Sequence, residues 1–531
     1  MLTEKYKSFL HLVVYQVYPR SFCDSNGDGI GDLRGVISKL DYLKELGINA
    51  IWLSPCFKSP NDDNGYDVSD YRDIMDEFGT LEDAKALISE MHKRNMLLFL
   101  DLVPNHTSTS HKWFIESRKS KDNPYSDYYY WADEPLTDWN ASFGGKAWEY
   151  DETRKQYYLH SYAVSQADLN WDNPAVVKEM QSVVDYWVDL GVDGFRIDVI
   201  DQISKDIKNN KNCFGPHLHE YINALFGREK TKHIFTVGEC WASNIDEVKN
   251  HCAAEREELS TLFQFDHIEC GRSDKYTYKK ESLAAYRDIL VKWQNLTIEN
   301  DLIYTLFTDN HDQSRFISRM GNDKELRYES ATCIAAMTYL LRGVPFIFEG
   351  QEFGSTASYF DDINDFRDIE TLNAYKEFSE TLNKDEVMEK VNFGSRDNPR
   401  RPMAWTDGKN GGFSDCDPWM PSPSRYKEIN LKSDILSKKS VFAFYKNLLK
   451  LRKSSEAFTL GSLKVLSKPE DKFFVFEREY EKEKFLVVCN FEEESVIENM
   501  EGKYKPVLAN CGRKKPSGKY SPYECAVYRA I

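Results

Sequence analysis

The chain has 531 residues, more than a single hydrophobic core usually holds, so we expect one large domain with satellites or two to three domains. Its 69 basic and 86 acidic side chains give a net charge of −17, which argues against nucleic acid and anionic membranes as partners and favours a neutral substrate. The N-terminus lacks a signal-peptide pattern, and no window approaches the roughly 18 apolar residues of a membrane span. The 11 cysteines are scattered, which is typical of reduced thiols. These features predict a soluble, cytoplasmic protein.

Short apolar runs alternate with amphipathic helices along the first two thirds of the chain. Apolar residues from 33 to 46 have helical spacing and are followed by Gly47. Thr80 and Asp83 resemble a capping box that opens a second helix, and Asn173 with Pro174 opens a third, which Gly191 ends. Eight runs are predicted as strands: 13–18, 50–53, 96–100, 194–197, 234–237, 262–265, 302–307 and 344–348.

Eight strands alternating with helices predict an α/β fold, a closed (β/α)8 TIM barrel formed by residues 1–103 and 175–455. An aromatic, loop-rich insertion after strand 3, residues 104–174, would overhang the barrel mouth. Residues 456–531 contain strand patterns at 472–477 and 485–491 and are predicted to form a C-terminal all-β domain, a β-sandwich.

Carboxylates follow four of the predicted strands, at the end of the barrel where chemistry takes place. Each could also cap the next helix, and for Asp198 alone that interpretation has even odds. Four at equivalent positions favour a site for a metal or for acid–base catalysis. The four are Asp101, Asp198, Glu239 and Asp312.

Asp198 and Glu239 follow neighbouring strands, which suits hydrolysis of a glycosidic bond with retention. Arg196 lies two residues before Asp198 on one strand face and is expected to keep that nucleophile ionised, while clustered negative charge raises the pKa of Glu239, the acid. Asp312 would hold sugar hydroxyls and stabilise the transition state. His106 and His311 would donate hydrogen bonds beside it, although each alone could be structural.

Four segments in order resemble the signature regions of the α-amylase clan of glycoside hydrolases (family 13): DLVPNH at 101–106, GFRIDVI at 194–200, VGE at 237–239 and DNHD at 309–312. QADLN at 166–170 is similar to the QPDLN marker of the oligo-1,6-glucosidase and dextran glucosidase group, with Ala167 in place of proline. Further similarity lies in VYQVYPRSF near the start, NGYDVSDY at 64–71 and SRDNPRRPMAW at 395–405. Cys240 after the acid and RPMAW at 401–405 depart from the usual pattern, which leaves substrate preference less secure than mechanism.

The resemblance implies the same three catalytic roles, with Arg196, His106 and His311 lining the subsite of the glucose to be released. Gln166 of the marker is a further candidate for substrate binding. Tyr66 would stack on this glucose, and Asp67 would form an ion pair with Arg400, or failing that Arg396, that closes the pocket behind it. A pocket closed behind one sugar implies exo action, the release of single glucose units.

The loop DSNGDGIGD, residues 24–32, places oxygens at alternate positions of an EF-hand-like loop, with Gly29 at the turn. Position 12 is Gly35 and lacks the bidentate glutamate, so the pattern alone is more typical of a polar turn. In the related glucosidases this loop holds a structural Ca²⁺ or Mg²⁺. The resemblance therefore implies a stabilising ion, no organic cofactor, and five ligands: Asp24, Asn26, Asp28, the Ile30 carbonyl and Asp32.

Val199, directly after the nucleophile, faces the +1 sugar in this group, where valine accompanies α-1,6 and threonine α-1,4 bonds. We therefore expect an exo-acting α-glucosidase for isomaltose, panose and short dextrans, with an oligosaccharide substrate and no obligate protein partner. Trehalose-6-phosphate hydrolase is the alternative, followed by an α-1,4- or sucrose-active α-glucosidase or a sucrose isomerase. A phosphate would need a cationic cluster that the sequence does not reveal. A non-catalytic transporter subunit would carry a membrane helix and lack the carboxylates.

Overall fold

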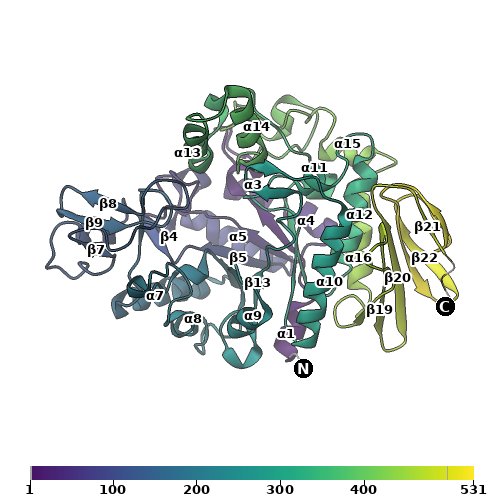
Figure 1. Cartoon of the computed structure of the whole chain (residues 1–531), viewed down its shortest axis with the longest axis horizontal. Coiled ribbons are helices and arrows are strands. Elements are labelled where there is room, and N and C mark those ends of the chain that lie inside the picture. Colours follow the sequence, from purple (N-terminus) through teal and green to yellow (C-terminus); the bar gives the residue numbers. More distant parts are fainter. Residues whose placement is uncertain (1–2, 499, 501) are drawn as a thin grey trace.

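In the computed structural model, which describes residues 3–498, 500 and 502–531, the core is a parallel eight-stranded sheet (Figure 1). Its order is β13-β12-β11-β5-β2-β1-β17-β16. The edge strands meet through side chains, since Thr261 Oγ1 donates to the Ile303 carbonyl at 2.9 Å and Thr305 Oγ1 to the Leu262 carbonyl at 3.1 Å. The predicted barrel is confirmed, with strands β1 (Val14–Val17), β2 (Ala50–Leu53), β5 (Leu97–Leu102), β11 (Gly194–Ile197), β12 (Phe235–Glu239), β13 (Thr261–Phe263), β16 (Thr305–Leu306) and β17 (Val344–Phe348).

Local signals fixed most helix ends. α5 (Leu81–Lys93) begins with the predicted capping box of Thr80 and Asp83, and α7 (Pro174–Leu190) runs from its Asn173 cap to Gly191, whose φ of +102° suits glycine. The single helix predicted over 33–46 is wrong, because the chain turns at Lys39. The break gives α3 (Leu33–Ser38) and α4 (Leu40–Leu46), each of which buries its own leucines.

Aromatic packing fills the barrel at the end away from the polar loops. α1 (Glu4–Phe9) lies across this end, where the Phe9 ring meets Phe235 at 5.1 Å and Phe235 stacks on Phe99 at 4.9 Å. The strands' carboxyl ends are left to face the opposite, open mouth. The other helices are α2 (Pro19–Phe22), α6 (Lys112–Ser117), α8 (Leu218–Phe226), α9 (Ile245–Cys252), α10 (Leu283–Glu299), α11 (Phe316–Met320), α12 (Arg327–Tyr339), α15 (Leu431–Leu436) and α16 (Val441–Lys453).

Two excursions from the barrel overhang its mouth. The first is the expected insertion, where β6 (His106–Ser108) pairs with β10 (Gln166–Asp168), and β7 (Trp131–Ala132), β9 (Gln156–Leu159) and β8 (Trp148–Asp151) form a small sheet. The second, a helical hairpin of α13 (Ile369–Phe378) and α14 (Lys384–Gly394), follows β17 and was not anticipated. Figure 1 shows the two excursions apart from one another, at the left and the top. Two short hairpins complete the loops, β3 (Phe57–Lys58) with β4 (Asp70–Ile74) and β14 (Arg272–Asp274) with β15 (Thr277–Tyr278).

The C-terminal residues form an antiparallel five-stranded sheet with a two-stranded sheet beside it. Alternate residues of β19 divide between two cores: Val475 faces the smaller sheet, whereas Phe474 and Phe476 pack toward the barrel. All 11 cysteines are free, as expected, and no described helix is long and apolar enough to cross a membrane. The strands are β18 (Ser462–Val465), β19 (Phe473–Tyr480), β20 (Glu483–Asn490), β24 (Cys525–Ala530) and β22 (Tyr504–Ala509), with β21 (Ser495–Ile497) and β23 (Gly518–Tyr520) in the smaller sheet.

Candidate active site

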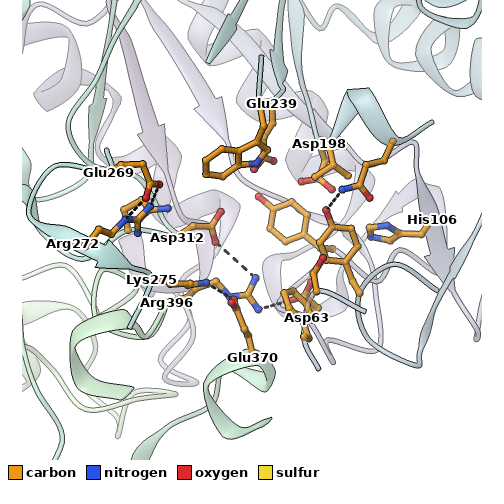
Figure 2. A pocket seen from close by; sticks show the side chains of 18 residues that line it. Asp63, His106, Asp198, Glu239, Glu269, Arg272, Lys275, Asp312, Glu370 and Arg396 are labelled. Atoms are coloured by element: carbon orange, nitrogen blue, oxygen red, sulfur yellow. Dashed lines mark hydrogen bonds and ion pairs between the residues drawn. The ribbon is translucent and has the colours of Figure 1, made fainter. Parts of the chain in front are cut away.

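A cavity of about 520 Å³ opens at the carboxyl ends of the barrel strands (Figure 2). The three candidate catalytic carboxylates converge on it, although up to 114 residues of sequence separate them. Seven residues proposed from the sequence line it: Tyr66, His106, Asp198, Val199, Glu239, Asp312 and Arg396. The other five proposed sugar-binding residues stand behind this lining: Asp67, Gln166, Arg196, His311 and Arg400.

One buried guanidinium, that of Arg196, joins three carboxylates. Its Nη1 lies 2.8 Å from both Asp101 Oδ1 and Asp198 Oδ1, and its Nη2 contacts Glu239. Trp52 Nε1 also donates to Asp101, at 3.1 Å. Because the guanidinium is rigid and planar, it fixes Asp198 and Glu239 as close neighbours, which is the arrangement that retaining glycosidases require.

Burial in this cluster works against the expectation that Arg196 keeps Asp198 ionised. Burial raises the pKa of Asp198 well above its usual range; Arg196 opposes this, while the carboxylates of Glu239 and Asp101 raise it further. Burial likewise raises the pKa of Asp101 to about 6. Asp198 and Asp101, which both bond to Arg196, therefore take up a proton more readily than a free aspartate does, and that proton is shared between them.

Asp312 has the opposite environment. Burial alone would raise its pKa, but His311, Arg400 and Arg396 outweigh it and hold the pKa of Asp312 well below its usual range. Arg400 Nη2 lies 2.7 Å from Asp312 Oδ1, and His311 Nε2 lies 3.1 Å from Oδ2. Asp312 is consequently a fixed negative charge at neutral pH.

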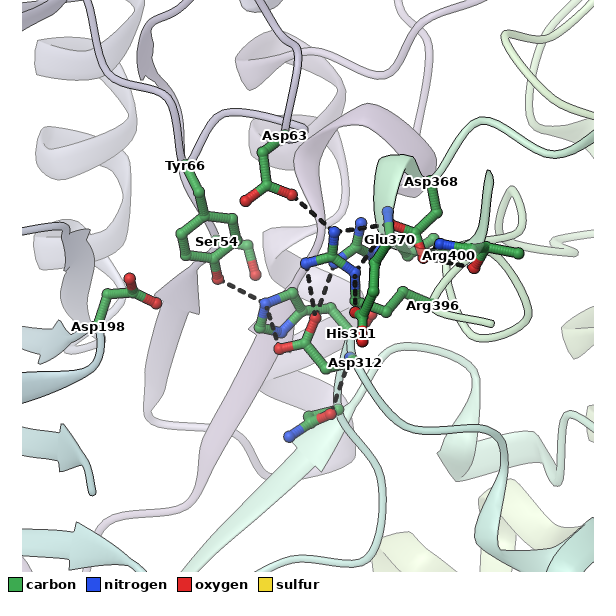
Figure 3. A network of polar contacts seen from close by, with 12 residues as sticks. Ser54, Asp63, Tyr66, Asp198, His311, Asp312, Asp368, Glu370, Arg396 and Arg400 are labelled. Atoms are coloured by element: carbon green, nitrogen blue, oxygen red, sulfur yellow. Dashed lines mark hydrogen bonds and ion pairs between the residues drawn. The ribbon is translucent and has the colours of Figure 1, made fainter. Parts of the chain in front are cut away.

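The ion pair that closes the pocket differs in part from the expectation: Asp63 takes the place of Asp67, and its partner is Arg396, the stated alternative to Arg400 (Figure 3). The pairing of Asp67 with Arg400 is wrong: the Asp67 carboxylate accepts hydrogen bonds from Ser59 Oγ and from the backbone N–H groups of residues 62 and 63. Asp63 instead meets Arg396 at 2.7 Å, and Arg396 also binds Asp368 at 2.6 Å. Asp63 turns toward the arginine because the loop before Tyr66 wraps its backbone amides around Asp67.

Tyr66, His106 and Gln166 occupy the same wall. The Tyr66 hydroxyl lies 2.5 Å from His311 Nε2, and the two rings stack 5.5 Å apart. Burial lowers the pKa of His106 to about 4, so this histidine is neutral. Gln166 Nε2 lies 3.2 Å from His106 Nε2 and donates to Asp63 at 2.9 Å, so it supports the wall from behind.

Val199 lines the cavity in a left-handed backbone conformation, with φ +34° and ψ +50°. A β-branched residue is strained there. This backbone conformation turns the chain sharply after Asp198 and places the Val199 side chain beside the Asp198 carboxyl.

The outer part of the cavity contains residues that the sequence did not single out. Trp241 is 52% exposed and stacks on Phe265 at 4.5 Å, an aromatic face of the kind that binds sugars. The outer cavity also contains one lysine and one arginine, and each has a carboxylate partner: Lys275 lies 2.5 Å from Glu370, and Arg272 pairs with Glu269. Their position could be found only from the fold, because both belong to the short β14–β15 hairpin, whose sequence has no distinctive pattern.

The 24–32 loop has the oxygen chemistry of a hard-cation site. Gly29 has φ +90°, and a Cβ there would lie 2.2 Å from the Asp417 carbonyl oxygen, so only glycine fits. Asp24 accepts from the backbone of Gly27 and Gly29, whereas Asp32 caps α3. Among the described residues, none of the loop's aspartates forms an ion pair, and no three acidic, histidine or cysteine side chains converge as a metal cluster.

Comparison with known proteins identifies the family. The family model described as alpha amylase, catalytic domain, matches residues 16–461. The chain belongs to the α-amylase family. It is 46% identical to an oligo-1,6-glucosidase of Bacillus cereus over 510 residues, 91% of each chain. A trehalose-6-phosphate hydrolase of Bacillus licheniformis superposes with a TM-score of 0.91 at 38% identity, covering 98% of this chain and 100% of that one.

A trehalulose synthase of Pseudomonas mesoacidophila superposes equally well, with a TM-score of 0.92 at 37% identity over 99% of both chains. The family assignment made from the four short signature regions is thus confirmed. Relatives with different named activities share this barrel, so substrate preference within the α-amylase family must be argued from the site.

Proposed function

We propose that the protein is a retaining, exo-acting α-glucosidase that releases glucose from the non-reducing end of α-1,6-linked isomalto-oligosaccharides. The observation that carries this proposal is the cavity, which is closed on one side by the Asp63–Arg396 ion pair and carries Val199 beside Asp198. A wall behind one sugar leaves no room for a chain to pass through. The names of the relatives, oligo-1,6-glucosidase and glucan 1,6-alpha-glucosidase, agree with this substrate class.

The reaction proceeds in two steps. In the first step, the Asp198 carboxylate attacks the anomeric carbon while Glu239, acting as the general acid, protonates the glycosidic oxygen. The aglycone leaves, and a covalent glucosyl–Asp198 ester remains. Glu239 then removes a proton from water, which attacks the same carbon and releases glucose with its α configuration. Asp312, always ionised, stabilises the positive charge that develops on the sugar ring.

Neutral aglycones suit the outer cavity better than phosphorylated ones. A sugar phosphate would need cations free to bind it. Lys275 and Arg272 each already have a carboxylate partner, and Arg396 has four. Hydrolysis of trehalose-6-phosphate is therefore the less favoured function.

Initial rates on isomaltose, panose, maltose, sucrose and trehalose-6-phosphate test the proposal. We expect the highest kcat/KM on isomaltose and panose, with α-glucose as the first product. A kcat/KM for trehalose-6-phosphate above that for isomaltose would overturn it, as would conversion of sucrose to an isomer without hydrolysis.

We also propose that Ca²⁺ binds the 24–32 loop and stabilises the fold. The support is the set of hard oxygen donors at alternate positions of the loop, together with the turn at Gly29 that only glycine fits. Bound Ca²⁺ would draw Asp24, Asn26, Asp28, Asp32 and the Ile30 carbonyl together. Calorimetry should show a lower melting temperature in EDTA than in Ca²⁺, and no such difference for Asp28→Ala. If chelation leaves the melting temperature of the wild type unchanged, the proposal is contradicted.

A further inference from the structure

Two polar side chains beside the nucleophile, Tyr162 and Gln202, have no role in the reaction described above. Both line the cavity. Tyr162 belongs to the inserted segment, and Gln202 ends the short 3-10 helix η2 (Ile200–Gln202), the turn that follows Val199. The Gln202 Nε2 donates a hydrogen bond to the Tyr162 phenolic oxygen at 2.9 Å. The pair therefore bridges the insertion and the loop that carries the nucleophile.

Each member of the pair is held in place by its own element. The Gln202 backbone N–H donates to the Val199 carbonyl at 2.9 Å, and its carbonyl accepts from the Lys205 ammonium at 2.7 Å. Lys205 is itself buried against Asp168 of the insertion, at 3.0 Å. The Tyr162 ring lies 5.3 Å from the His106 ring. The phenolic oxygen consequently has a fixed place beside the part of the pocket assigned to the released glucose.

The bonding pattern leaves one hydrogen without a partner. With the Gln202 amide assigned as donor to the phenolic oxygen, the hydroxyl hydrogen of Tyr162 has no acceptor among the described residues, and the buried Gln202 Oε1 also lacks a partner. The phenol stays protonated, since burial raises the pKa of Tyr162 well above its usual value and the Asp198 and Glu239 carboxylates raise it further. Tyr162 thus presents a permanent donor to the pocket.

We propose that Tyr162 donates its hydroxyl hydrogen to a hydroxyl group of the bound glucose unit, and that Gln202 is a positioning residue that orients it. The inference rests on the proposed function in one respect, that a glucose unit occupies the pocket beside His106 and Asp198. A sugar hydroxyl supplies the acceptor that the protein lacks. The His106 ring and the Tyr162 hydroxyl would then hold the same sugar from adjacent sides.

Tyr162→Phe tests the proposal because it keeps the ring and removes only the hydroxyl. We expect glucose binding, measured by titration calorimetry, to weaken about 5- to 10-fold, the loss typical of one hydrogen bond. KM should rise by a similar factor for both isomaltose and 4-nitrophenyl α-glucoside, because both place glucose in this subsite. The melting temperature should stay unchanged. Gln202→Met should cause a smaller loss, and the double variant should lose no more than Tyr162→Phe.

Tyr129→Phe is the matched control, since it removes a buried hydroxyl that binds Thr107 at 2.7 Å within the insertion but does not line the cavity. It should leave glucose binding intact. The proposal is overturned if Tyr162→Phe binds glucose as tightly as the wild type, or if its KM rises for isomaltose alone. Glucose binding does not depend on linkage, so a wild type that fails to cleave isomaltose would refute the proposed function while leaving this inference testable.

Discussion

Replacing Arg396 with methionine should strongly destabilise the protein. Arg396 is 6% exposed and donates to Asp368 from Nε at 2.9 Å and Nη2 at 2.6 Å, and to Asp63 at 2.7 Å. The substitution leaves two buried carboxylates without these bonds. Removal of one partner from a buried ion pair costs about 3–5 kcal/mol, because an uncompensated charge stays behind.

The cost should depend on pH, because the orphaned carboxyls can take up protons. Without Arg396 their pKa values rise above those of the unfolded chain, so the native state gains protons as the pH falls. The loss in free energy of unfolding should thus be larger at pH 8 than at pH 5. Equilibrium urea unfolding of the wild type and of Arg396→Met at both pH values measures this difference.

Arg396→Met/Asp63→Asn serves as the matched variant, since it removes the positive charge together with one of the two negative charges. It should recover part of the stability lost in Arg396→Met at pH 8. A loss of less than 1 kcal/mol in Arg396→Met at pH 8, or the same loss at both pH values, would refute the reasoning about an uncompensated buried charge.

Three further changes test the site. Asp198→Ala should abolish hydrolysis of isomaltose and leave the melting temperature within a few degrees of the wild type; substantial turnover would remove Asp198 from its role as nucleophile. Val199→Thr should raise the ratio of maltose to isomaltose hydrolysis, and an unchanged ratio would sink the linkage argument. Burial, and then Glu239, raise the pKa of Asp201 to about 7. Because this value lies above that of the unfolded chain, Asp201 lowers the free energy of unfolding as the pH rises from about 4 through 7, by up to about 4 kcal/mol. Asp201→Asn should therefore gain stability relative to the wild type between pH 5 and pH 8, and urea midpoints that keep a constant difference would contradict this.

The sequence alone determined the barrel and the carboxylates at its mouth. Period-two apolar runs, caps and Gly191 are local signals, and each acts within a few residues of itself. In a barrel of eight strands that alternate with helices, all carboxyl ends of the strands face one mouth. Asp198, Glu239 and Asp312 could therefore be placed together at that mouth without any measured distance. The insertion was visible for the same reason, as an interruption of a regular alternation.

Only the tertiary structure decided the partners of the buried charges. Asp63 and Asp67 lie four residues apart in one polar loop, and nothing local distinguishes them. Asp63 pairs with Arg396, 333 residues later in the chain, because the loop's own backbone amides already bind the Asp67 carboxylate. The raised pKa values of Asp101 and Asp198 likewise depend on burial and on the other charges around one guanidinium. Strand and helix patterns are short-range, whereas charge pairing and protonation follow from burial and distance, which exist only after the chain has folded.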